Sequence, residues 1–160
     1  MSFVHKYVKL VVRSIASIAC LFNTTLFASE VNTGYFGNVA IKGYDPVAYF
    51  TQQKAVKGSS DFAHTWLGAE WNFSSDEHRL LFMSEPIRYV PQYGGYCAGG
   101  LAYGDSTTNI DPEAWKIIDG KLYLNYDPGT AEELVEVEGH LEKTEENWPA
   151  IQAALAESYQ

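Results

Sequence analysis

The dipeptide Asp119-Gly120 stands between two short apolar runs, residues 115–118 and 122–125. Such a pair between apolar runs favours a β-hairpin, because Asp and Gly tolerate the positive φ of a tight type I′ turn. A second hairpin is predicted upstream, where the alternating segment 61–67 is followed by a glycine turn and a partner strand around Trp71. The chain is therefore expected to contain at least two antiparallel hairpins.

Short helices are expected around these hairpins, and residues 39–41 resemble a further short strand. The expected helices cover residues 47–50, 74–85, 98–103, 131–147 and 151–155. Capping-box spacing, a Ser or Thr followed three residues later by Glu, marks two starts, at Ser74 and Thr130. Proline lacks an amide hydrogen and is expected to end the same two helices, at Pro86 and Pro149. This mixture predicts a small α+β domain with short antiparallel strands and several short helices.

Residues 1–28 differ from the rest of the chain in their order of charge and apolarity. Their basic residues come first: His5, Lys6, Lys9 and Arg13. A mostly apolar, uncharged run follows over residues 14–27, and Ala28 offers a small residue for cleavage. This order is typical of a secretory signal peptide, so we expect a periplasmic or secreted protein. Residues 29–38 would then be a lead segment, and residues 39–160 a single domain.

Three other interpretations of the N-terminus remain open. A permanent membrane anchor is one, although the uncharged run 14–29 is shorter than the ~20 residues of a spanning helix. Leu26, two residues before Ala28, is unfavourable for cleavage there, so the membrane anchor remains an alternative. A lipoprotein would use Cys20, and a buried N-terminal helix would leave the charge asymmetry unexplained. After cleavage, no stable membrane insertion is expected.

Removal of residues 1–28 leaves 8 of the 11 Lys and Arg and all 20 Asp and Glu, a net charge of −12 instead of −9. Such a surface repels the phosphates of nucleic acids, which require clustered Lys and Arg. It can attract cations or a basic partner. Only Cys97 remains after cleavage, so the mature chain forms no internal disulfide and relies on its aromatic-rich core.

Cys97 and His64 are the residues most suited to chemistry. Cys97 follows two glycines at a predicted helix start, where a thiol can be a metal ligand or a nucleophile with a lowered pKa. It can equally be a small buried apolar residue. His64 is predicted on an aromatic strand face, as a core residue or as a ligand that joins Cys97 around a metal. His78 and His140 are expected at the surface.

Several segments, in this order, resemble the exported branch of the YHS-domain family. They are residues 43–50 (GYDPVAYF), 71–75 (WNFSS), 86–89 (PIRY), 91–98 (PQYGGYCA), 111–115 (DPEAW), 119–125 (DGKLYLN) and 147–149 (NWP). The resemblance implies a small α+β domain often linked to metal handling. Other modules of the family carry cysteines where this chain has Ala48 and Ser74, so those thiolate ligands are absent here.

Three functions follow from these observations. The first is a non-catalytic binding domain for a small ligand or a transition metal such as copper, zinc or iron. It would use Cys97 and His64, with Tyr44 and Tyr96 as further ligand-binding residues. The second is a structural or protein-interaction domain in which Cys97 is buried. The third is a single-thiol redox enzyme, which requires an exposed and activated Cys97.

Overall fold

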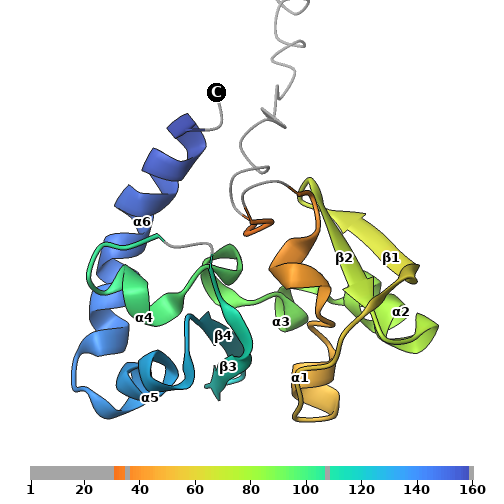
Figure 1. Ribbon diagram of the computed structural model, residues 1–160, viewed down its shortest axis with the longest axis horizontal. Coiled ribbons are helices and arrows are strands. Elements are labelled where there is room, and N and C mark those ends of the chain that lie inside the picture. The colour runs from red at the N-terminus through yellow and green to blue at the C-terminus, as the bar shows by residue number, and fades with distance from the viewer. Residues whose placement is uncertain (1–30, 35–36, 107–108, 159–160) are drawn as a thin grey trace, which may run out of the picture.

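The computed structural model describes residues 31–34, 37–106 and 109–158. Over these residues the fold is α+β, with six α-helices and two antiparallel two-stranded sheets (Figure 1). This confirms the predicted fold class. The predicted signal peptide, residues 1–28, and part of the lead segment lie outside the described residues. Among the helices that are described, none has the length and apolarity needed to cross a membrane.

The first sheet pairs β1 (Ser59–Trp66) with β2 (Ala69–Phe73) as an antiparallel hairpin. The two turn residues, Leu67 and Gly68, have φ of 49° and 75°, as a tight two-residue hairpin turn requires. The register places His64 opposite Trp71. The predicted upstream hairpin is therefore confirmed.

The second sheet pairs β3 (Asp111–Ile118) with β4 (Lys121–Asn125). Asp119 and Gly120 form the turn, with φ of 50° and 74°, so the turn chemistry that predicted this hairpin is realised. The last residues of β4 are fully buried and lead directly into the following acidic helices.

Short helical segments precede the first hairpin and connect it to the second. They are η2 (Ala40–Gly43), α1 (Ala48–Thr51), α2 (Asp76–Ser84), α3 (Pro86–Tyr89), η3 (Gln92–Gly95) and α4 (Ala98–Leu101), where η denotes a 3-10 helix. The strand expected at residues 39–41 was wrong, because Ile41 has a φ of 44° that no strand accommodates. The cap of α2 lies one residue later than predicted, since Ser75 rather than Ser74 accepts the bond from the His78 amide.

Two helices, α5 (Pro128–Glu136) and α6 (His140–Ser158), complete the described chain. A single helix over residues 131–147 was wrong, because the chain turns at Gly139, whose φ is 78°. Pro149 does not end α6. Pro149 has no amide hydrogen to donate to the carbonyl oxygen of Glu145. Glu145 is exposed, so water can donate a hydrogen bond to this carbonyl oxygen instead.

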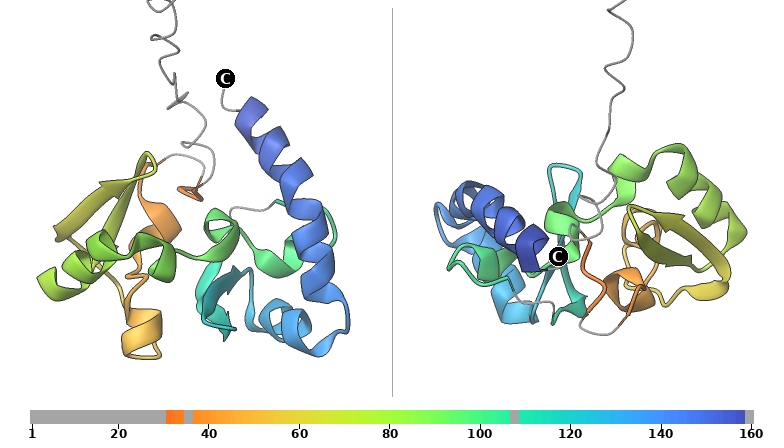
Figure 2. Two further views of the ribbon diagram at one scale, coloured as in Figure 1. Left: turned by 180° about the vertical axis from the view of Figure 1, so that it is seen from behind. Right: turned by 90° about the horizontal axis from the view of Figure 1, so that it is seen from above.

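One hydrophobic core includes residues from both hairpins. Its buried members include Tyr49, Trp71, Phe73, Phe82, Leu122 and Leu124. A second cluster, which includes Leu101, Tyr123 and Leu134, lies between η3, β4, α4 and α5. The ring of Trp148 on α6 packs against it, 5.4 Å from that of Tyr93. Figure 2 shows α6 running along the outside of α4 and α5, at the end of the molecule away from the first hairpin.

Candidate functional site

Cys97 is placed by a tight backbone passage immediately before α4. Tyr93, Gly94 and Gly95 all have positive φ, so the chain reverses within a few residues. A Cβ at Gly95 would lie 2.6 Å from the Ile41 Cγ2 atom, which excludes any larger residue from this passage. The adjacent glycines therefore serve the close packing that brings Cys97 to the end of β4.

The Cys97 thiol is an acceptor for two backbone amides. Its Sγ atom accepts from the Gly100 amide at 3.4 Å and from the Tyr126 amide at 3.2 Å, and the residue is 1 % exposed. Burial raises the pKa of the thiol above its ordinary value of 9.0, and Asp105 and Asp127 add to this effect against the two amide bonds. A thiol that stays protonated at neutral pH is a poor nucleophile.

A pocket of about 270 Å³ opens beside Cys97. It is lined by Cys97, Gly100, Tyr103, Asp105, Tyr126, Thr130 and Glu133, and we name it the Cys97 pocket. Its two tyrosines are exposed, Tyr103 at 72 % and Tyr126 at 49 %, so their rings are available to a ligand. The lining therefore combines a neutral thiol, two aromatic rings and two carboxylates.

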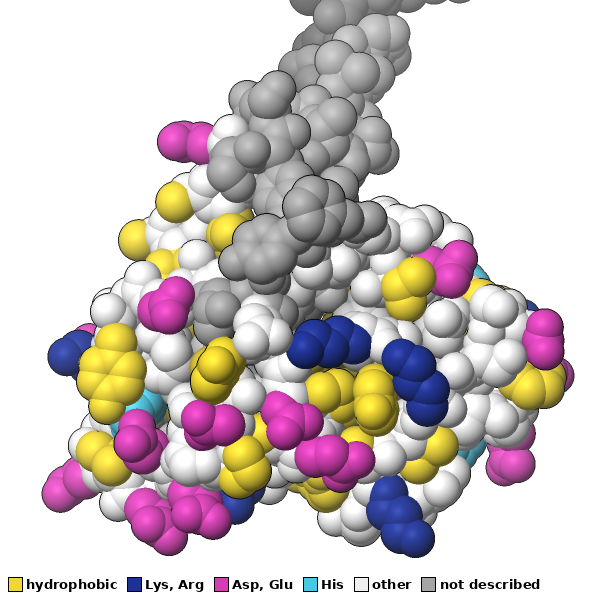
Figure 3. All heavy atoms as spheres, viewed as in Figure 1, with side chains coloured by type: hydrophobic (Ala, Val, Ile, Leu, Met, Phe, Trp, Pro, Cys, Tyr) yellow, Lys and Arg dark blue, Asp and Glu magenta, His cyan; other side chains and the backbone are white. Residues whose placement is uncertain are grey.

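A third carboxylate, that of Asp127, lies next to this pocket. Asp127 caps α5 by accepting from the Thr130 amide at 2.7 Å and from its hydroxyl at 3.0 Å. These bonds hold the pKa of Asp127 below its usual value, so it is ionised at neutral pH. The pocket thus lies in a negative field. Figure 3 shows acidic side chains gathered over the lower left of the molecule, where α5 lies.

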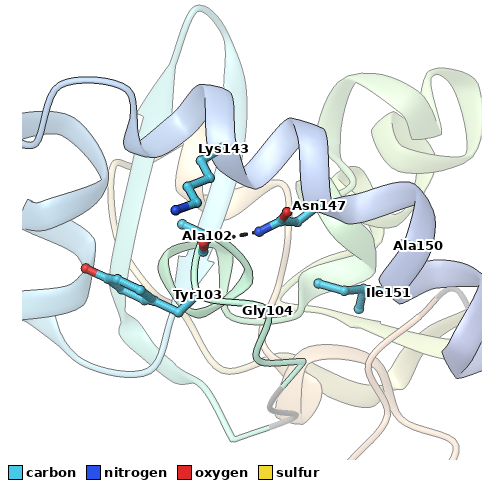
Figure 4. A pocket seen from close by; sticks show the side chains of 7 residues that line it. All are labelled: Ala102, Tyr103, Gly104, Lys143, Asn147, Ala150 and Ile151. Carbon is cyan, nitrogen blue, oxygen red and sulfur yellow. Dashed lines mark hydrogen bonds between the residues drawn. The ribbon is translucent and has the colours of Figure 1, made fainter.

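A second pocket, of about 500 Å³, lies between α6 and the loop that follows α4. It is lined by Ala102, Tyr103, Gly104, Lys143, Asn147, Ala150 and Ile151, and we name it the α6 pocket (Figure 4). In that view Lys143, Asn147 and Ile151 project from α6 toward the loop. The Asn147 side-chain amide donates to the carbonyls of Leu101 and Ala102, at 2.9 and 3.1 Å, and holds the loop against α6.

The other predicted ligand residues are not brought to Cys97. His64 lies in the middle of β1, in the half of the molecule opposite α4 (Figure 1). Tyr44 packs under the Lys57 ammonium, which lies 4.9 Å from its ring centroid. Tyr96 is fully buried, and none of these three residues lines either pocket.

The donor set around Cys97 does not fit a transition metal. The described part of the chain contains no group of three or more His, Cys, Asp or Glu residues arranged to hold a metal ion. The Ser74 hydroxyl donates its proton to Asp45 at 2.6 Å. The residues suited to chemistry are therefore distributed over separate parts of the fold.

A buried polar network around Asp45 is the feature that the sequence did not reveal. Asp45 is fully buried, and its carboxylate accepts from the amides of Val47, at 2.9 Å, and Ser74, at 2.8 Å. The Nδ1 atom of His78 lies 2.6 Å from Asp45 Oδ2, so the expectation of a surface histidine was wrong. The network joins α1, β2 and α2. Its only sequence signal was that Asp45 and Ser74 both precede helices.

His140 was also wrongly expected at the surface. It is 5 % exposed, and its Nε2 atom lies 3.0 Å from the carbonyl oxygen of Gly99, to which it donates. One turn later, the Thr144 hydroxyl donates to the Ala98 carbonyl at 3.1 Å. Together these bonds attach α6 to α4 and fix the position of the walls of both pockets.

Comparison with known proteins adds no further constraint. No family model, no curated protein and no solved structure matches this chain.

Proposed function

We propose that this protein is an exported, non-catalytic YHS-like binding domain that takes a small organic cation in the Cys97 pocket. The observation that carries the proposal is the lining of that pocket, where Asp105 and Glu133 meet the exposed rings of Tyr103 and Tyr126. Carboxylates attract an ammonium or guanidinium group, and tyrosine faces stabilise it by cation–π contact. The family assignment and the export rest on the segments described above and on residues 1–28.

The properties of the thiol support binding rather than thiol chemistry. A raised pKa keeps Cys97 neutral, so the thiol forms an uncharged wall beside the carboxylates. The pocket volume lies just below the usual range of about 300–1,000 Å³ for ligand sites, which suits a guanidinium or alkylammonium group rather than a large cofactor. Cys97 and His64 lie in separate halves of the fold, so joint metal binding by these two residues is not part of the proposal.

Titration of the purified protein with methylguanidinium, followed by amide NMR shifts, tests this function. The neutral isostere methylurea is the matched ligand. We expect methylguanidinium to shift signals of Tyr103, Tyr126 and Glu133 with millimolar affinity that weakens as salt rises, because exposed charges are screened. Methylurea should leave these signals in place.

Protein variants separate the pocket from the general acidity of α5. Glu133→Gln removes a carboxylate from the lining, whereas Glu132→Gln removes an exposed neighbour outside it. Binding should weaken several-fold in the first variant and stay within about twofold in the second. Equal effects of the two variants, or equal binding of methylurea, would contradict the proposal.

A further inference from the structure

The Cys97 pocket and the α6 pocket adjoin through one side chain. Tyr103 lines both, and the residues around it are divided between them, with Gly100 and Asp105 in the first and Ala102 and Gly104 in the second. The first pocket is bounded by α5 and the second by α6. A ligand that covers the exposed ring of Tyr103 can therefore enter both.

The two pockets select different chemistry. The α6 pocket has apolar walls from Ala102, Ala150 and Ile151, and its charged residue is Lys143 (Figure 4). The ammonium of Lys143 repels a second cation, so a positively charged group is directed to the Cys97 pocket. An uncharged apolar side chain is the group that gains most by covering the alanine and isoleucine surface.

The surroundings of the pockets are strongly acidic. Residues 98–158 contain 13 acidic and 3 basic residues, whereas residues 31–97 contain 6 acidic and 5 basic residues. The charge of the protein is thus concentrated on the half that carries both pockets. Exposed Val135 and Val137 lie within this acidic region and can contact the aliphatic stems of basic side chains. This combination is complementary to a basic polypeptide that carries the cationic group.

We propose that the ligand is a segment of a basic partner protein. It inserts an arginine or lysine into the Cys97 pocket and an apolar side chain two residues away into the α6 pocket. In an extended peptide, residues i and i+2 point to the same side about 7 Å apart, which allows the pair to straddle a tyrosine ring. The inference rests on the proposed function, because it identifies the source of the cation.

Fluorescence anisotropy with short labelled peptides tests the inference. The probe is a capped pentapeptide of glycines with Arg and Leu at positions two and four, made in both orders. One comparison peptide has Ala in place of Leu, and another has citrulline, the neutral isostere of Arg, in place of Arg. The better of the two orders should bind at least about tenfold more tightly than either comparison peptide, as expected for a buried Leu side chain and a paired cation.

Variants of the α6 pocket provide the matched control. Ala150→Gln places a polar side chain in the pocket, and Ala153→Gln makes the same change at an exposed position of α6 outside it. The first should weaken binding of the Arg–Leu peptide about fivefold or more but leave methylguanidinium binding unchanged. The second should alter neither.

The outcomes separate this inference from the function on which it rests. If the Arg–Ala peptide binds as tightly as the Arg–Leu peptide, the two-pocket peptide site is wrong, while the cation pocket stands. If Ala150→Gln has no effect on the Arg–Leu peptide, the same conclusion follows. If neither methylguanidinium nor any peptide binds, both proposals are wrong.

Discussion

His78 Nδ1 lies 2.6 Å from Asp45 Oδ2, and this pair joins the start of α1 to α2, the helix that follows the first hairpin. Because a carboxylate only accepts hydrogen bonds, Nδ1 carries the proton in this pair. On the other side of the ring, Nε2 lies 3.2 Å from the Thr51 hydroxyl oxygen, which also lies 3.1 Å from the Val47 carbonyl oxygen. The network is closed by protein groups on every side, which is why we assign it to stability rather than to ligand binding.

Replacing Asp45 by Asn should strongly destabilise the protein. The variant loses the charge that faces His78 and places an amide donor among groups that are themselves donors. Leaving a buried hydrogen-bond donor without its acceptor costs about 1–3 kcal/mol. Urea unfolding followed by tryptophan fluorescence measures the loss. Asp61→Asn, at an exposed position of β1, is the control and should change the free energy of unfolding by less than about 0.5 kcal/mol.

Replacing Ser74 by Ala tests the same network with a smaller change. The Ser74 hydroxyl donates to Asp45 at 2.6 Å, and its loss leaves one fewer donor on a buried carboxylate. We expect a cost of about 1–3 kcal/mol in unfolding free energy, typical of a hydrogen bond to a charged group. Ser60→Ala, exposed on β1, should be close to neutral. A Ser74→Ala variant as stable as the Ser60 control would show that the bond contributes nothing.

Replacing Gly95 by Ala should cost more than the same change at Gly139. Both glycines have positive φ, 84° and 78°, so the strain on an alanine backbone is similar. At Gly95 the new Cβ would also lie 2.6 Å from Ile41, whereas nothing lies within 4 Å of it at Gly139. The difference in unfolding free energy should be about 1–3 kcal/mol, the cost of overpacking a core. Equal losses would mean that the core adjusts freely around residue 95.

The Cys97 thiol should react slowly in the folded protein. In a Cys20→Ser background, so that one thiol is counted, labelling by iodoacetamide at pH 7 should be at least about tenfold slower than in urea. The cause is burial, which limits access and raises the pKa of the thiol. Labelling as rapid in the folded as in the unfolded state would revive the thiol-enzyme hypothesis.

The same thiol should make the protein less stable in alkali. Its pKa is raised in the folded state, so above its ordinary value of 9.0 the unfolded chain releases this proton first. The free energy of unfolding therefore falls as pH rises from about 9 through the folded pKa. Cys97→Ser removes this contribution, and the slope of stability against pH between 9 and 10 should become shallower. Tyr49, whose pKa is also raised by burial, adds a further loss above its ordinary value of 10.0.

The sequence correctly predicted the parts of the fold that depend on interactions between residues close together in the chain. Both hairpins follow from alternation and turn residues, and the α+β class follows from their mixture with short helices. Errors arose where a distant contact overrides a local preference. Ile41 has a left-handed backbone conformation in a segment that packs against Gly95. Pro149 lies within α6, a helix that hydrogen bonds attach to α4.

The candidate site shows the same division. The sequence by itself determined that Cys97 would follow a tight glycine passage and that the C-terminal half would be strongly acidic. Only the tertiary structure decided that Cys97 meets Tyr126, Thr130 and Glu133 from the segments after β4, and not His64. Spacing along a chain specifies partners within a turn or hairpin, because those contacts are local. Contacts between residues far apart in the chain depend on how the whole core packs.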